Sequence, residues 1–113
     1  MDDEGQLKSK KDETETEVYT LKLYVAGRTK NCLAAYVNLR NICKERLAGK
    51  CRIEVVDLWE KPSLAKDNQI VAIPTLVRKD LTSEWRVVGD LSNTERVLSS
   101  LDLTEENRYP DNE

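Results

Sequence analysis

Apolar and polar residues alternate over residues 18–25, VYTLKLYV, and this pattern predicts a β-strand. One face carries only apolar or aromatic side chains, namely Tyr19, Leu21, Leu23 and Val25. The other face carries Val18, Thr20, Lys22 and Tyr24. Because both faces hold apolar groups, we expect this strand to lie in the interior of a sheet. Gly27 follows the strand and ends the pattern.

Between residues 32 and 47, apolar side chains recur at three- and four-residue steps, which predicts an amphipathic helix with one apolar stripe. Thr29 or Asn31 can cap the start of this helix through a side-chain oxygen. Gly49 follows its end, where a left-handed backbone is least costly for glycine. Cys32 falls on the apolar stripe, so a small buried side chain is one interpretation of this cysteine.

The next stretch predicts three short strands and a helical turn. Residues 51–59 alternate again and predict the second strand. Pro62 stands near the start of a short helical turn, a position that suits proline. Residues 74–80 and 84–90 predict two further strands on either side of a turn near the sequence DLTS.

The last periodic segment, residues 91–101, predicts a helix. Ser92 or Asn93 can cap its start, and Glu95 is placed to close a capping box. The side chains expected to face the core are Leu91, Val97, Leu98 and Leu101.

The predicted order is β-α-β, a short helix, then β-β-α. The first unit requires a right-handed parallel crossover, and the last two strands form an antiparallel hairpin. The result is a single α/β domain over residues 18–103, with a four-stranded mixed sheet and helices on its faces, as in thioredoxin-like domains. Residues 1–17 and 104–113 are polar and acidic, and we expect them to be tails, the first of them disordered.

Charge is unevenly distributed along the chain. Residues 1–17 hold seven acidic and three basic residues, whereas residues 18–101 hold nine acidic and fourteen basic ones. The mildly basic body suits an acidic protein surface, and the acidic tails would repel phosphates. Since the sequence shows neither aromatic platforms nor a known nucleic-acid motif, we expect no nucleic-acid partner.

The chain contains no histidine, so it lacks the commonest general base and the commonest metal ligand. Its three cysteines match no zinc spacing and suit a reducing compartment better than a disulfide framework. Neither a membrane-spanning apolar run nor a secretory signal is visible. We therefore expect a cytoplasmic protein that is not an enzyme, with no metal or cofactor and no membrane partner.

The stretch TKNC, residues 29–32, bears on redox chemistry. A dithiol oxidoreductase of this fold has Cys-x-x-Cys here, and the first thiol is the nucleophile at the helix N-terminus. Thr29 stands at the nucleophile position and Cys32 at the resolving position. Pro74 in AIPTLV fits the place of the cis proline of thioredoxin-like folds, and an ordinary trans proline opening a strand is the alternative.

Three stretches, LKLYVAGRTKN, VVDLWEKPSLAKDNQIVAIPTLV and VVGDLSNTERVLSSLDL, resemble the KaiB family of circadian clock proteins over residues 18 to about 103. The resemblance implies a protein without catalytic activity or cofactor. It implies binding to the ATPase ring of KaiC, which modulates the phosphorylation state of the ring, sequestration of KaiA, and competition with the kinase SasA. It also implies two folds: a resting homo-oligomer, a tetramer or dimer, with the order β-α-β-β-α-α-β, and a thioredoxin-like monomer that binds KaiC.

The sequence departs from the family pattern at several positions. LTSEW replaces a proline run between the third and fourth strands, and Ser100 replaces a glycine. Serine favours the helical form by about a few tenths of a kcal/mol over glycine. Glu54 and Gln69 replace family lysines, which changes the expected partner-facing surface. We therefore infer a divergent KaiB-like protein.

Two sets of candidate residues follow. The exposed edge of the second strand and its flanks are expected to bind the partner, through Arg52, Glu54, Asp57, Glu60, Lys61 and Gln69. Three residues match family positions near the junction of the two folds: Tyr19, Ser100 and Asp102. A solvated charged face, core packing and helix capping are the structural alternatives. Two alternative functions are a KaiB-like adaptor of a non-clock signalling or stress pathway and a thioredoxin-like redox protein.

Overall fold

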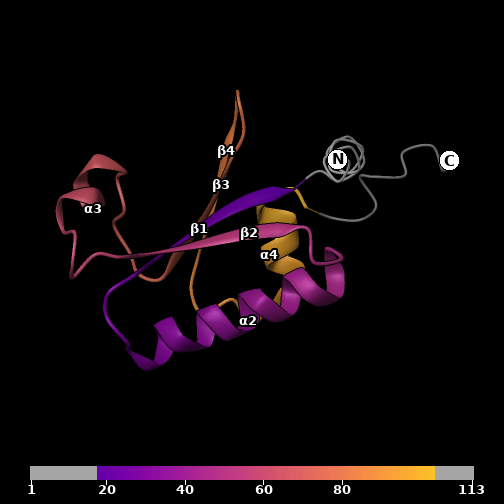
Figure 1. Cartoon of the computed structure of the whole chain (residues 1–113), viewed down its shortest axis with the longest axis horizontal. Coiled ribbons are helices and arrows are strands. Elements are labelled where there is room, and N and C mark those ends of the chain that lie inside the picture. Colours follow the sequence, from indigo (N-terminus) through magenta and orange to yellow (C-terminus); the bar gives the residue numbers. More distant parts are fainter. Residues whose placement is uncertain (1–17, 104–113) are drawn as a thin grey trace, which may run out of the picture.

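The computed structural model describes residues 18–103, which form seven helices and strands (Figure 1). In chain order these are β1 (Tyr19–Val25), α2 (Lys30–Arg46), β2 (Cys51–Asp57), α3 (Ser63–Asp67), β3 (Thr75–Lys79), β4 (Glu84–Val88) and α4 (Thr94–Ser100). This is the predicted β-α-β-α-β-β-α order and not the alternative β-α-β-β-α-α-β. The two predicted tails lie outside the described residues.

The four strands form one mixed sheet with the order β2-β1-β3-β4. β1 pairs in parallel with β2, from Tyr19 opposite Cys51 to Val25 opposite Asp57. β1 also pairs antiparallel with β3, and β3 pairs antiparallel with β4. The interior position predicted for β1 is confirmed. Among the described residues, β2 and β4 are the edge strands.

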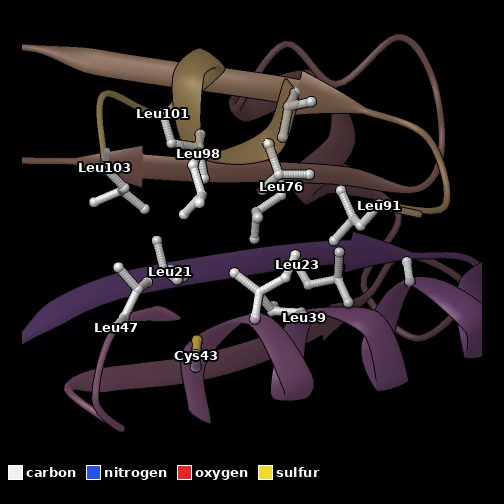
Figure 2. Packing of buried hydrophobic residues seen from close by; sticks show 14 of the residues in the cluster. Leu21, Leu23, Leu39, Cys43, Leu47, Leu76, Leu91, Leu98, Leu101 and Leu103 are labelled. Atoms are coloured by element: carbon white, nitrogen blue, oxygen red, sulfur yellow. The ribbon is translucent and has the colours of Figure 1, made fainter. Parts of the chain in front are cut away.

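The main core lies between one face of the sheet and the helices α2 and α4. Figure 2 shows its leucine side chains converging between α2 and the strands. Those buried most completely include Leu21, Leu23, Leu39, Leu76 and Leu98. Full burial of one such side chain stabilises the fold by roughly 1.5–3 kcal/mol. The four positions of α4 and its approach that were predicted to face inward are all buried.

A smaller apolar cluster lies on the opposite face of the sheet, toward α3. Tyr24 of β1 and Val77 of β3 meet Leu58 and Ile70 there, with Leu64 of α3 packed against them. The second apolar face of β1 is therefore used, which explains why its sequence is apolar on both sides.

Side-chain caps fix the starts of α2 and α4. Thr29 Oγ1 accepts a hydrogen bond from the Cys32 N–H at 3.2 Å, so Thr29 caps α2, which begins two residues earlier than predicted. Asn93 Oδ1 accepts from the Arg96 N–H at 3.1 Å and caps α4. The capping box predicted for Glu95 is wrong, because Arg96 occupies the third helical position. The Glu95 carboxylate instead accepts a hydrogen bond from Arg46.

The second strand ends at Asp57, two residues earlier than predicted. Asp57 Oδ1 accepts hydrogen bonds from the Trp59 N–H at 2.9 Å and the Gly27 N–H at 3.0 Å, and these bonds turn the chain.

The Ile73–Pro74 peptide bond, immediately before β3, is cis. None of the helices described between residues 18 and 103 has both the length and the hydropathy needed to span a membrane.

Candidate functional site

The open edge of β2 is the first part of the candidate site. Within residues 18–103, β2 pairs only with β1. The Lys50 C=O accepts from the Tyr19 N–H, and the Leu58 N–H donates to the Val25 C=O. Main-chain groups alternate sides along a strand, so the N–H and C=O groups of Ile53 and Val55 point away from β1. This edge offers main-chain donors and acceptors to a strand of another molecule.

Two of the predicted partner-binding residues lie along this edge. Arg52 and Glu54 are exposed and share the face of the sheet opposite α2, since they stand two residues apart on one strand. Glu54 is the register partner of Lys22 on β1, and Arg52 is the partner of Thr20. The structure thus places a charged pair beside the open main chain of β2.

Three more predicted residues lie at the end of β2. The Asp57 C=O accepts hydrogen bonds from the N–H groups of Glu60 and Lys61, both at 3.1 Å. The side chains of Glu60 and Lys61 are exposed, whereas that of Asp57 is half-buried. Because the Asp57 carboxylate already accepts from Gly27 and Trp59, it shapes the turn that presents its two neighbours.

Gln69, the remaining predicted residue, makes its contacts away from β2. Its backbone is left-handed, with φ at 57°, and its C=O accepts a hydrogen bond from Arg86 Nη1 at 2.8 Å. Arg86 Nη2 also donates to the Asn68 C=O at 2.6 Å. Arg86 belongs to β4, so Gln69 is bound to the strand at the opposite edge of the sheet from β2.

Exposed apolar side chains beside β2 form a feature that the sequence patterns did not reveal. Trp59 is 71% exposed, and its ring lies over Gly27, so closely that a Cβ on Gly27 would come within 2.4 Å of Trp59 Cζ3. Val55 and Leu33 are also exposed and line a cavity of about 370 Å³ between β2 and the start of α2. The available signal was Trp59 itself, a large aromatic residue that directly precedes the charged residues Glu60 and Lys61.

The two positions that hold the Cys-x-x-Cys pair in oxidoreductases serve here for helix capping and core packing. Cys32 is only 4% exposed, so the interpretation of Cys32 as a buried packing residue is confirmed. Thr29, at the position of an oxidoreductase nucleophile, uses its hydroxyl oxygen to cap α2. Between residues 18 and 103, no three side chains of the metal-ligating types come together.

Arg78 of β3 connects the residues predicted at the fold junction. Its Nη1 donates to the C=O of Leu101 at 2.7 Å and to the C=O of Asp102 at 3.2 Å. Its guanidinium carbon lies 5.0 Å from the centre of the Tyr19 ring and 4.3 Å from that of the Trp85 ring. Ser100 is the last residue of α4, directly before these acceptors. The end of α4 is therefore tied to β1 and β4 through one arginine.

Shifted carboxylate pKa values cluster on β4 and the loop after it. A hydrogen bond from Arg86 lowers the pKa of Glu84, and the nearby charge of Lys79 acts in the same direction. Hydrogen bonds from Ser92 lower the pKa of Asp90, whose carboxylate accepts from the Ser92 N–H at 3.0 Å. On β1, burial raises the pKa of Tyr24. Local hydrogen bonds, nearby charges and burial account for these shifts.

The fold and the site together define a thioredoxin-like domain that has Thr29 in place of the first cysteine of the Cys-x-x-Cys pair at the start of α2 and that presents an open strand edge. Among solved structures, the N-terminal domain of Synechococcus elongatus SasA matches with a TM-score of 0.63 and 21% identity, covering 80% of this chain and 89% of that one. Mitochondrial thioredoxin 3 from Saccharomyces cerevisiae matches with a TM-score of 0.60 and 16% identity, covering 85% and 88%. These likenesses establish the thioredoxin-like fold.

Sequence comparison identifies the family within this fold. Residues 22–103 match the model of the KaiB domain. A circadian clock oscillator protein KaiB from Synechococcus sp. (strain RCC307) is 44% identical over 87 residues, which are 77% of this chain and 79% of that protein. The chain belongs to the KaiB family, as the sequence motifs predict.

Proposed function

We propose that this protein is a KaiB-like regulator that binds a KaiC-type ATPase ring and modulates its phosphorylation state without catalysing a reaction. Membership of the KaiB family supports the class of partner, since the curated relatives are named circadian clock oscillator proteins. The thioredoxin-like order of the elements supports a binding-competent form, because it is the form that the family resemblance links to KaiC.

The observation that carries the proposal is the open edge of β2. Ile53 and Val55 direct main-chain groups outward, and an exposed strand edge can extend its sheet onto a partner. Arg52 and Glu54 beside it, with Glu60 and Lys61 beyond Asp57, would select the partner by charge. The exposed Trp59 and Val55 supply the aromatic and apolar contacts that interfaces favour.

Size-exclusion chromatography with the KaiC homologue of the same organism, in the presence of ATP, tests the proposal. We expect the protein to elute with the ATPase ring. Arg52→Glu should weaken this association, and Arg40→Glu, an equal charge change at an exposed position on α2, is the matched control. Absence of co-elution at high micromolar protein would contradict the proposal.

Expectations about the oligomeric state, the location and further partners follow from the same proposal. The protein would bind the ring as a cytoplasmic monomer, and KaiA or a SasA-type kinase would be further members of the system. A homo-oligomer would hold the alternative fold. Sedimentation of the free and bound protein would distinguish these states.

A KaiB-like adaptor in a non-clock pathway is the second candidate, and the β3–β4 hairpin favours it. The family proline run is absent, and Asp80 Oδ1 instead organises the turn by accepting from the N–H groups of Thr82 and Ser83. Leu81 at the tip is fully exposed. Affinity capture from lysate of the same organism would separate the two candidates, since recovery of a different kinase or ATPase in place of a clock-type KaiC would favour the adaptor.

A further inference from the structure

Cys43 of α2 and Cys51 of β2 are brought together by the turn between their elements. After α2, Ala48 and Gly49 are left-handed, with φ of 56° and 74°. The chain folds back so that the Gly49 N–H donates to the Cys43 C=O at 2.8 Å. Cys51 follows Gly49 by only two residues, as the first residue of β2. The turn therefore brings the second cysteine back to the level of the first.

The two side chains share a cavity and a packing cluster. Both line a cavity of about 490 Å³ between α2 and β2, together with Arg40 and Lys44. Cys43 is 5% exposed and Cys51 is half-buried against the same core. Figure 2 shows the Cys43 sulfur pointing from α2 toward the sheet. A small polar reagent can reach the pair through the cavity, and two cationic side chains lie at its wall.

The thiols also interact with each other. A hydrogen bond from the Cys51 thiol lowers the pKa of Cys43, and the pKa of Cys51 is raised because it remains the protonated donor and is partly buried. The thiolate is the nucleophilic form of cysteine. Cys43 is thus the attacking sulfur of the pair and Cys51 the resolving one.

We propose that Cys43 and Cys51 form a dithiol site that hydrogen peroxide converts into an intramolecular disulfide. The Cys43 thiolate attacks one peroxide oxygen, the O–O bond breaks, and hydroxide leaves, giving a sulfenic acid on Cys43. The Cys51 sulfur then attacks the Cys43 sulfur, and water leaves. In total, two thiols lose two electrons and two hydrogens to one peroxide, which becomes two waters.

The disulfide would join α2 covalently to the first residue of the open edge strand. Cys32 is excluded from this chemistry by position. It lies eleven residues before Cys43 on the same helix, which corresponds to roughly 16 Å along the axis. Cys32 is therefore an internal control for reactivity in the folded protein.

Peptide mapping of the peroxide-treated full chain tests the proposal. Trypsin cleaves after Lys30, Arg40, Lys44, Lys50 and Arg52, so the three cysteines fall on separate peptides, 31–40, 41–44 and 51–52. Peroxide treatment should lower the mass of the intact protein by two hydrogen atoms, and subsequent blocking of free thiols should add a single blocking group. The digest should contain 41–44 joined to 51–52, with Cys32 still blocked as a thiol.

Two variants define the order of the steps. Cys51→Ser should stop the reaction at the sulfenic acid of Cys43, which dimedone captures, and Cys32→Ser should form the disulfide as the wild type does. Oxidation of all three cysteines at equal rates would overturn the proposal, and so would cross-linking of Cys32 or no cross-link at all in the wild type. The wild-type map alone decides the main point, so the test does not depend on the folding of either variant.

Discussion

Replacing Arg78 by methionine should loosen the end of α4, because methionine keeps the length of the side chain and removes its donors. Arg78 Nη1 supplies hydrogen bonds to the C=O groups of Leu101 and Asp102, and its guanidinium lies between two aromatic rings. Leu101 is fully buried, so its C=O lies at the point where α4 joins the core.

The size of the effect follows from these contacts. A hydrogen bond from a charged group contributes roughly 1.5–3 kcal/mol, and the longer bond to Asp102 adds little because it is exposed. A partly exposed cation–π contact contributes about 0.5–1 kcal/mol. Because Arg78 is itself half-exposed, we expect a loss near the lower limit, about 2 kcal/mol. For a domain of this size that corresponds to a fall in Tm of about 8–16 °C.

Urea and thermal unfolding measure the loss, and NMR secondary chemical shifts over residues 85–103 report where it acts. Helical shifts over α4 should weaken in Arg78→Met. Arg40→Met is the matched control, since Arg40 lies 5.7 Å from the Tyr36 ring and donates to the Tyr36 hydroxyl on the exposed side of α2. If the stability of Arg78→Met lies within about 0.5 kcal/mol of that of the wild type, and its α4 chemical shifts are unchanged, the role assigned to Arg78 is refuted.

Two further predictions concern the turn after β1 and the acid stability of β4. Gly27→Ala should destabilise the protein by about 1–2 kcal/mol in urea unfolding, since the backbone φ of Gly27 is +70° and the new Cβ meets the Trp59 ring. Adding Trp59→Ala should recover only the stability lost to the contact with the ring. Full recovery would contradict a contribution from the backbone conformation. The pKa of Glu84 is lowered in the folded state, so its contribution is present above the ordinary pKa of 4.5 and is lost as the pH falls through the lower folded value. Glu84→Gln should therefore be slightly less stable than the wild type at neutral pH, by at most about 1 kcal/mol for an exposed pair, and as stable as the wild type in acid. A stability difference that grows in acid would contradict a stabilising role of the ionised Glu84 carboxylate.

Local patterns predicted the elements well because the periodicities are strong. β1 is apolar on both faces, and the structure uses one face against α2 and α4 and the other against α3. The Thr29 cap follows from the preference of a threonine oxygen for the free N–H groups of a helix start. Glu95 shows the limit of this reasoning, since a shift of one residue in the start of α4 moved it out of the capping-box position.

Contacts between distant residues were the part that the sequence did not reveal. Asp57 was a candidate for partner binding because it is charged and lies on the edge of the second strand, yet its carboxylate accepts a hydrogen bond from the N–H of Gly27, thirty residues away. Arg78 was not singled out, although it contacts Tyr19 and the end of α4. Such roles depend on which elements pack together, and composition or spacing within one segment does not contain that information.

The most direct test of the docking edge is a titration of the ATP-bound KaiC homologue with two variants of Val55, an exposed residue whose N–H points away from β1. Val55→Pro removes this outward donor at an edge position where proline is tolerated, and Val55→Thr keeps both the donor and the β-branched shape. We expect Val55→Pro to weaken binding by about tenfold or more, as loss of one main-chain hydrogen bond and of close strand contact requires. Val55→Thr should bind nearly as the wild type does. Equal affinity of the proline and threonine variants, with both shown by circular dichroism to be folded, would contradict binding through the β2 edge.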